Sequence, residues 1–144
     1  MQVFNRNARR EYFLEDSLEA GLVLSGAEVK SVRLGKVDLS EAFAKITGGE
    51  VFLKNCYIYP YIGARSDYDP RRDRKLLLHK SQIAQLEAKL RGGKYTLVPI
   101  RLYNAHNILK MEIALGSTKK KYDHRKDIKK RDEERKIQQE LKGV

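Results

Sequence analysis

The chain has 144 residues and a net charge of +11, with 30 Lys and Arg against 19 Asp and Glu. This length fits one domain with an appendage, and the positive charge favours a polyanionic partner, either nucleic acid or an acidic membrane. No apolar run approaches the ~18–20 residues of a membrane span, and residues 1–5 do not begin a secretory signal, so we expect a cytoplasmic protein with no membrane partner.

The first third of the chain predicts two strands and a helix. Residues 11–14 and 21–24 are apolar and extended in character. Ser25 is followed three residues later by Glu28, which is the pattern of a capping box at the start of a helix. We expect this short helix to end at Gly35.

The middle of the chain predicts a β-hairpin and a long loop. Apolar segments at residues 43–46 and 51–59 flank a Gly-Gly turn. Cys56, the only cysteine, lies in the second segment, where we expect a buried and inert thiol. Residues 60–75 are polar, and a loop of this length in a small domain is usually functional or disordered.

A second helix and a second hairpin complete the domain. Ser81 has the character of a helix N-cap, and Gly92 marks the end of that helix. Apolar residues alternate over residues 96–103 and 109–115, which predicts two more strands. The total of about six strands, two or three short helices and mostly hairpin connections predicts a mainly β, antiparallel fold. A small closed or partly open barrel would remove the exposed sheet edges.

The composition changes near Ser117, so we expect a domain at residues 1–116 and a basic tail at residues 117–144. Helix-forming residues dominate the second half of the tail, but they carry no apolar stripe. Ile128 and Ile137, for example, are nine positions apart and fall on opposite faces of a helix. We expect a tail that is disordered when free and helical when bound to an acidic partner. A solvated terminus without function is the alternative.

Enzyme chemistry finds little support in the sequence. His79, His106 and His124 are scattered and show no metal-ligand spacing. There is no phosphate-binding loop and no dinucleotide fingerprint. Asp67 and Asp69 lie close together, but the basic residues that follow them suggest ordinary charge balance. We expect no catalytic residue, no metal and no cofactor.

Three basic clusters point to nucleic acid instead. Arg and Lys hold phosphates, while a neighbouring aromatic ring can stack on an unpaired base. One such cluster is more often a solvated surface, but three in a short chain favour RNA or DNA. The clusters contain Asn5, Arg6, Arg9 and Arg10 beside Tyr12; Arg74 and Lys75 after Arg71 and Arg72; and Lys119, Lys120 and Lys121 beside Tyr122.

Several motifs together resemble the small protein B family, the SsrA-binding proteins that partner transfer-messenger RNA in bacterial ribosome rescue. They appear in the family's order and cover nearly the whole chain. The matching stretches are NRNARREYF at residues 5–13, LEAG at 18–21, GAEVKSVRLGK at 26–36, DP at 69–70, RKLLLH at 74–79, YTLVP at 95–99 and KKYDHRKDIK at 120–129.

The resemblance implies an antiparallel six-stranded barrel of the oligonucleotide-binding type. It also implies an RNA-binding adaptor that binds the tRNA-like domain of transfer-messenger RNA and delivers it to stalled ribosomes in trans-translation. The implied partners are transfer-messenger RNA, the small-subunit decoding centre and messenger channel of the ribosome, and elongation factor Tu through the charged RNA. We expect a monomer.

Residues that matter for RNA binding in the family match Glu19, Leu77 and His79, and the matching stretch at 26–36 adds Lys30 and Arg33. Some family members carry Asn where this chain has His79. A carboxylate repels phosphate, so Glu19 should accept hydrogen bonds from base N–H groups or ribose hydroxyls, or orient a neighbouring Arg. An ordinary charge on an edge strand is the alternative.

In the family, the tail enters the ribosome where a codon and the downstream messenger would lie. Tyr122 stands where His is common, His124 replaces a Lys, and Thr118 falls where Gly is common. A basic structural ribosomal protein is the alternative function, and an RNA-processing enzyme is a third. The tail residues expected to bind the ribosome are Lys119, Lys120, Lys121, Tyr122, Asp123, His124, Arg125 and Lys126.

Overall fold

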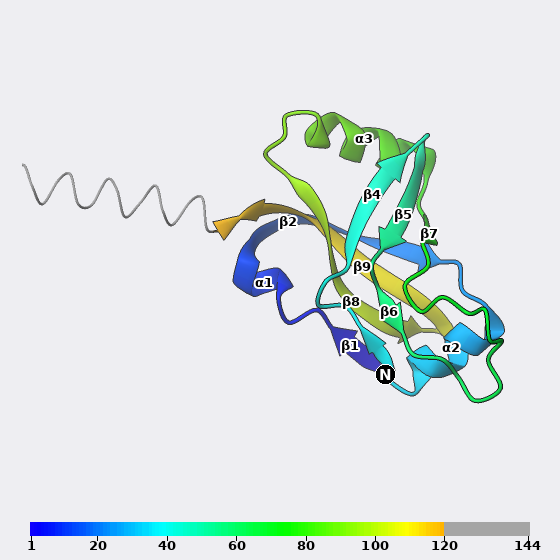
Figure 1. Ribbon diagram of the computed structural model, residues 1–144. Coiled ribbons are helices and arrows are strands. Elements are labelled where there is room, and N and C mark those ends of the chain that lie inside the picture. The colour runs from blue at the N-terminus through cyan, green and yellow to red at the C-terminus, as the bar shows by residue number, and fades with distance from the viewer. Residues whose placement is uncertain (120–144) are drawn as a thin grey trace, which may run out of the picture.

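The computed structural model describes residues 1–119 of the chain. They form nine strands and three helices (Figure 1). In chain order the elements are β1 (Gln2–Phe4), α1 (Ala8–Glu11), β2 (Tyr12–Leu22), α2 (Gly26–Arg33), β3 (Val37–Asp38), β4 (Phe43–Thr47), β5 (Glu50–Lys54), β6 (Tyr57–Ile58), β7 (Arg74–Leu77), α3 (Lys80–Leu90), β8 (Thr96–Ala105) and β9 (Ile108–Thr118).

Six of the strands pair in a closed circuit. Hydrogen bonding runs from β8 through β4, β5, β7, β2 and β9, and β9 pairs with β8 again. Every pairing is antiparallel, as the predicted hairpins require. The contact that closes the circuit between β4 and β8 is a single pair, Ala44 with Leu97. The prediction of a mainly β, antiparallel fold is confirmed, and a small barrel matches this circuit.

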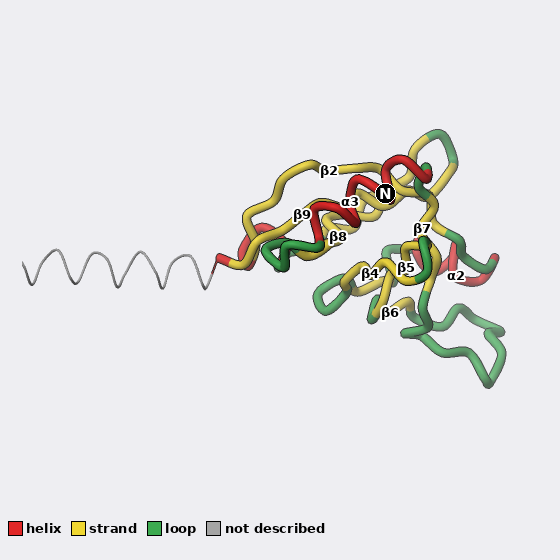
Figure 2. The backbone as a smooth tube through the Cα atoms, turned by 90° about the horizontal axis from the view of Figure 1, so that it is seen from above, coloured by secondary structure: helices red, strands yellow, loops and turns green. Residues whose placement is uncertain are grey.

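The remaining strands lie outside the circuit. β1 adds to the outer edge of β8, while β3 and β6 form a separate two-stranded ribbon. In Figure 2, β2, β8 and β9 lie on one side of the molecule, and β4, β5 and β6 lie on the other. Figure 1 places α3 and α2 at opposite ends of the strands.

The core fills the inside of this circuit with aliphatic side chains. β9 contributes Leu109, Met111, Ile113 and Leu115, which alternate along the strand and are at most 6% exposed. Leu86 of α3 joins the same core from one end of the barrel. The alternation that predicted β9 therefore marks its buried face.

The structure confirms the sequence predictions of a helix cap, a hairpin turn and a buried cysteine. The predicted capping box is present, with the Ser25 hydroxyl accepting from the Glu28 backbone N–H at 3.2 Å. The β4–β5 hairpin turns on Gly48 and Gly49, whose φ angles of +60° and +75° suit glycine. Cys56 is buried, as expected.

Two strand predictions were wrong in extent. The two short strands expected at 11–14 and 21–24 are parts of one strand, β2, which bends at a bulge between Glu15 and Leu18. The strand expected at 51–59 stops at Lys54 because Asn55 adopts a left-handed φ of 57°. The chain then turns, and β6 pairs with β3 instead of continuing the hairpin.

The ends of two other elements also differ from expectation. α3 begins at Lys80 with His79 as its N-cap, not at Ser81, and the His79 backbone N–H donates to the Gln82 side chain at 3.0 Å. β9 runs to Thr118, so Ser117 still pairs with β2 at the place where we expected the tail to begin. The expectations for Lys120 to Lys126, and for a disordered or helical tail, lie outside the described residues.

Candidate nucleic-acid interface

Strand register gathers Glu19, Leu77 and His79 on one outer face of the barrel. Leu77 pairs with Gly21 across β7 and β2, and Glu19 lies on the same face two residues before Gly21. Because the strands are antiparallel, the chain after Leu77 runs towards Glu19, and His79 is two residues along. All three side chains are exposed to solvent. Three residues far apart in sequence therefore form one surface.

The same face continues across β9 and β8 in two rows. One row carries Lys110 and Tyr103 beyond Gly21. The other carries Glu112 and Arg101 beyond Glu19. The row between them points inward and is buried, with Ala20, Met111 and Leu102 all at most 1% exposed. We call the outward residues Glu19, Leu77, Arg101, Tyr103, Lys110 and Glu112 the outer patch.

Hydrogen bonds join four members of the outer patch. The Tyr103 hydroxyl donates to Oε2 of Glu19. Arg101 Nε donates to Oε2 of Glu112 at 2.5 Å, and the Arg101 guanidinium lies 4.0 Å from the centre of the Tyr103 ring. Burial and the hydrogen bond to Glu19 raise the pKa of Tyr103 to about 12, so the phenol stays protonated at neutral pH. The patch thus combines an acceptor, a cation and an aromatic ring.

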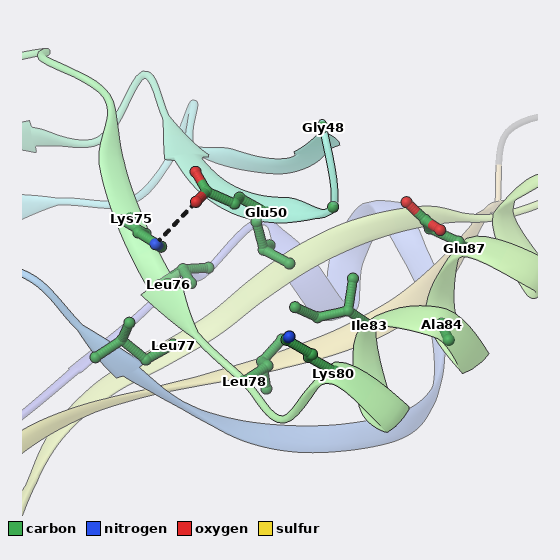
Figure 3. A pocket seen from close by; sticks show the side chains of 12 residues that line it. Gly48, Glu50, Lys75, Leu76, Leu77, Leu78, Lys80, Ile83, Ala84 and Glu87 are labelled. Carbon is green, nitrogen blue, oxygen red and sulfur yellow. Dashed lines mark hydrogen bonds and ion pairs between the residues drawn. The ribbon is translucent and has the colours of Figure 1, made fainter.

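A groove of about 560 Å³ lies beside the outer patch, between β7, the β4–β5 turn and the first turns of α3 (Figure 3). Its apolar wall includes Leu78 and Ile83. Its rim carries Lys80 and the ion pair between Lys75 and Glu50, 3.1 Å apart. Leu77 lines this groove as well, so the groove and the patch are continuous.

The other predicted basic residues lie at the two ends of β2. Arg6, Arg9 and Arg10 are exposed beside or within α1, which immediately precedes β2. Lys30 and Arg33 lie on α2, which follows β2, and Arg33 donates to the Asn107 carbonyl at 3.0 Å. Figure 1 shows α1 and α2 beyond opposite ends of the 11-residue β2, so these two groups are well separated.

Arg74 requires a correction, because the structure buries it completely. Its guanidinium donates to Oε2 of Glu28 at 2.7 Å, to the Cys56 carbonyl at 2.6 Å and to the Pro70 carbonyl at 2.9 Å. Its side chain is 0% exposed, as is that of Glu28. A phosphate has no access to this group, so we replace the expected RNA contact with a structural role.

Glu28 is the centre of this buried cluster. Burial alone would raise its pKa, but hydrogen bonds from Arg72, from the Ser25 backbone and from Arg74 outweigh that effect. The result is a pKa of about 2 and a carboxylate that is charged at neutral pH. The Tyr68 hydroxyl also contacts Glu28, at 3.4 Å, which helps fasten the loop between β6 and β7 to α2.

Asn5 also has a structural place. It is 8% exposed, its backbone N–H donates to the Ile100 carbonyl at 2.7 Å, and its side chain donates to the Pro99 carbonyl at 2.9 Å. Asn5 therefore anchors the segment between β1 and α1 to β8. The RNA contact expected for Asn5 stays a prediction beside this structural role, and the neighbouring Arg6 is exposed.

Lys119 is the last residue of the described chain. Its ammonium donates to the Arg9 carbonyl at 2.6 Å and lies 5.2 Å from the centre of the Phe13 ring. The remaining candidate tail residues lie outside the described range. Asp67 shows the expected charge balance, since it pairs with Arg65 at 3.4 Å, whereas Asp69 accepts a hydrogen bond from the Arg71 backbone N–H at 2.9 Å.

The sequence contained a signal for the missed members of the outer patch. Arg101 and Tyr103 occupy the outward phase of one alternating strand, and Lys110 and Glu112 occupy that of the next. A short turn between the strands fixes which of these residues face each other. Reading both strands as a hairpin in register would have placed Arg101 opposite Glu112.

Within residues 1–119, no group of three or more His, Cys, Asp or Glu is arranged to hold a metal ion. No helix in this same range has the length and apolar character needed to cross a bilayer.

Comparisons with known proteins agree with this geometry. The family model of the SmpB protein matches residues 2–143. An SsrA-binding protein of Geobacter metallireducens is 48% identical over 139 residues, which cover 96% of this chain and 91% of that protein. One of Bacillus pumilus is 50% identical over 135 residues, covering 93% and 86%.

A solved structure described as "tmRNA-SmpB: a journey to the center of the bacterial ribosome" contains a similar fold. Its matching chain has a TM-score of 0.68 and 42% identity, and the match covers 81% of this chain and 82% of that one. Sequence and fold agree over most of both chains, and the chain belongs to the SmpB protein family.

Proposed function

We propose that this chain binds transfer-messenger RNA and acts with it on the ribosome, as an adaptor without a catalytic step of its own. The observation that carries the proposal is the similarity to SsrA-binding proteins over more than 90% of the chain. The related chain in a tmRNA–SmpB–ribosome structure supports the same two partners. Translating ribosomes are cytoplasmic, so we place the protein in the cytoplasm.

The barrel supplies the RNA-binding part in this proposal. The outer patch brings together Glu19 and Leu77, with His79 next to them, at the positions that matter for RNA binding in the family. The exposed Arg6, Arg9 and Arg10 at one end of β2 provide positive charge for phosphates of the tRNA-like domain.

The tail supplies the ribosome-binding part. Residues 120–144 contain ten Lys and Arg against six Asp and Glu, and so contribute +4 to a chain whose total is +11. We propose that they enter the decoding centre and the empty messenger channel, with Tyr122 to Lys126 at the decoding end. Tyr122 keeps an aromatic face for stacking on a ribosomal base.

Truncation separates the two parts. A chain ending at Lys119 keeps all of β9 and should bind the tRNA-like domain with an affinity within about threefold of the full chain. The same truncated chain should no longer support peptide tagging on stalled ribosomes. Filter binding and a cell-free tagging assay measure the two properties. Equal loss of binding and tagging would contradict the division of labour.

The amount of protein on ribosomes distinguishes an adaptor from a structural ribosomal protein. An adaptor should be substoichiometric on ribosomes from growing cells and should increase when messengers lacking a stop codon accumulate. Quantitative mass spectrometry of purified ribosomes gives this ratio. One copy per ribosome under all conditions would favour a structural ribosomal protein.

A further inference from the structure

Two carboxylates face each other on the outer patch. Glu19 of β2 pairs directly with Glu112 of β9, and both side chains point outward. Like charges directly opposite each other destabilise a sheet, so each needs a compensating partner. The structure gives them different partners.

Glu112 is paired with a cation, Arg101, at 2.5 Å. Glu19 accepts a hydrogen bond only from the neutral hydroxyl of Tyr103, and its Oε1 accepts none within the part of the chain that is described. Arg101 acts on Glu19 through space without a direct ion pair, so Glu19 keeps an open acceptor on the surface of a basic protein. Such a group repels phosphate and attracts hydrogen-bond donors.

Tyr103 is itself held in place. Arg101 covers one face of its ring at 4.0 Å, and Arg101 is fixed in turn by Glu112 and by the side chain of Gln2 at 3.4 Å. Tyr103 thus has little freedom to turn away, and its hydroxyl fixes one oxygen of Glu19. The other oxygen stays available, because Glu19 is exposed and that oxygen makes no hydrogen bond within residues 1–119.

We infer that Tyr103 is a positioning residue that presents Glu19 as an acceptor for a neutral donor of the bound RNA, either a ring N–H of an unpaired guanine or uracil or a ribose 2′-hydroxyl. The inference rests on the proposed function, because it assigns a role within the same RNA-binding face. In this inference Glu19 binds a neutral donor of the RNA and not a phosphate, Tyr103 orients Glu19, and Arg101 holds Tyr103 in place. Single-stranded RNA offers both donor types on accessible edges.

The test is a double-mutant cycle on full-length protein with a transcript of the tRNA-like domain. Tyr103→Phe removes only the hydroxyl and keeps the ring under Arg101, so the fold is retained. It should weaken binding roughly tenfold, the scale of a hydrogen bond to a charged group. Glu19→Gln should weaken it by a similar factor. The double variant should bind the RNA as tightly as the single variant that has the lower affinity, because both substitutions remove the same interaction.

The salt dependence of binding separates positioning from phosphate contact. Tyr103→Phe should leave the slope of log affinity against log salt unchanged, since no phosphate contact is lost. Tyr59→Phe is the matched control, because Tyr59 is exposed and its hydroxyl makes no hydrogen bond within residues 1–119. It should bind like the wild type. A urea midpoint equal to that of the wild type shows that each variant is folded.

Substituted RNAs identify the donor. If a base is the donor, methylation of the ring N–H of unpaired guanines and uracils should abolish the Tyr103→Phe effect. If the ribose is the donor, 2′-deoxy substitution throughout the tRNA-like domain should abolish it.

The inference is overturned if Tyr103→Phe binds as tightly as the wild type, or if its effect adds to that of Glu19→Gln. It is also overturned if the effect keeps its full size on both kinds of substituted RNA. Failure of the wild-type protein to bind the unmodified transcript would instead contradict the proposed function, so the two failures are distinguishable.

Discussion

Replacing Arg74 by Met tests the structural role of the buried ion cluster. The substitution keeps most of the side-chain volume but removes the guanidinium. It leaves the Cys56 carbonyl without its guanidinium donor and removes the direct contact to Glu28, while the Pro70 carbonyl keeps only the Ile58 backbone N–H at 3.0 Å. The expected result is a marked loss of stability without a specific loss of phosphate contacts.

The magnitude follows from the partners that remain. Removing one member of a buried ion pair typically destabilises a protein by about 3–5 kcal/mol. Glu28 keeps its bonds to Arg72 and to the Ser25 backbone, so we expect a value near the lower limit, about 3 kcal/mol. With a urea m-value of about 1.5 kcal/mol/M, the unfolding midpoint falls by about 2 M.

Urea denaturation followed by circular dichroism measures the change. Arg65→Met is the matched control, because Arg65 is 88% exposed and its ion pair with Asp67 is long, at 3.4 Å. It should lose less than about 1 kcal/mol. In RNA binding, folded Arg74→Met should keep the wild-type salt slope, whereas Arg9→Ala should flatten it. An unchanged urea midpoint combined with a flatter slope for Arg74→Met would refute the reasoning.

Two further predictions concern stability. The low folded-state pKa of Glu28 stabilises the protein fully above the ordinary pKa of 4.5, and this stabilisation is lost as the pH falls towards 2. The Glu28 contribution to the unfolding free energy should therefore fall by about 3 kcal/mol over that range. Glu28→Gln should lack this component when the two acid titrations are compared by urea unfolding. Gly116→Ala should destabilise the protein by about 1–3 kcal/mol, because the added Cβ would lie 2.7 Å from Val98 and 3.0 Å from Tyr12. Gly26→Ala is the control, because its Cβ would have no neighbouring atom within 4 Å. Equal urea midpoints for both variants would contradict the packing argument.

The fold was largely predictable because its turns and caps have specific chemistry. Gly48-Gly49 and the Ser25–Glu28 box each fix a local conformation with few alternatives. The extent of β2 was not predictable in the same way. Its bulge at residues 15–18 interrupts the alternation of apolar residues, so one strand looks like two separate segments.

The candidate site was predictable at Glu19, Leu77 and His79 only through the resemblance to a family. Arg74 shows why charge alone misleads. It begins a strand in which Arg74 and Leu76 point inward while Lys75 and Leu77 point outward, but the run of three leucines hides that alternation. Its acidic partner, Glu28, lies 46 positions earlier in the chain, a separation that no local pattern reveals.

The pairing of β2 with β9 has a consequence for how the chain is made. Tyr12 at the start of β2 pairs with Thr118 at the end of β9, so an N-terminal strand depends on one of the last strands to be synthesised. At about 5–20 residues per second, roughly 5–20 s separate the two during translation. Through that interval residues 12–20 of β2 lack their partner strand, although Gly21 and Leu22 can already pair with β7, and the barrel closes only once β9 has been made. Synthesis of this chain therefore ends with its slowest and least local folding step.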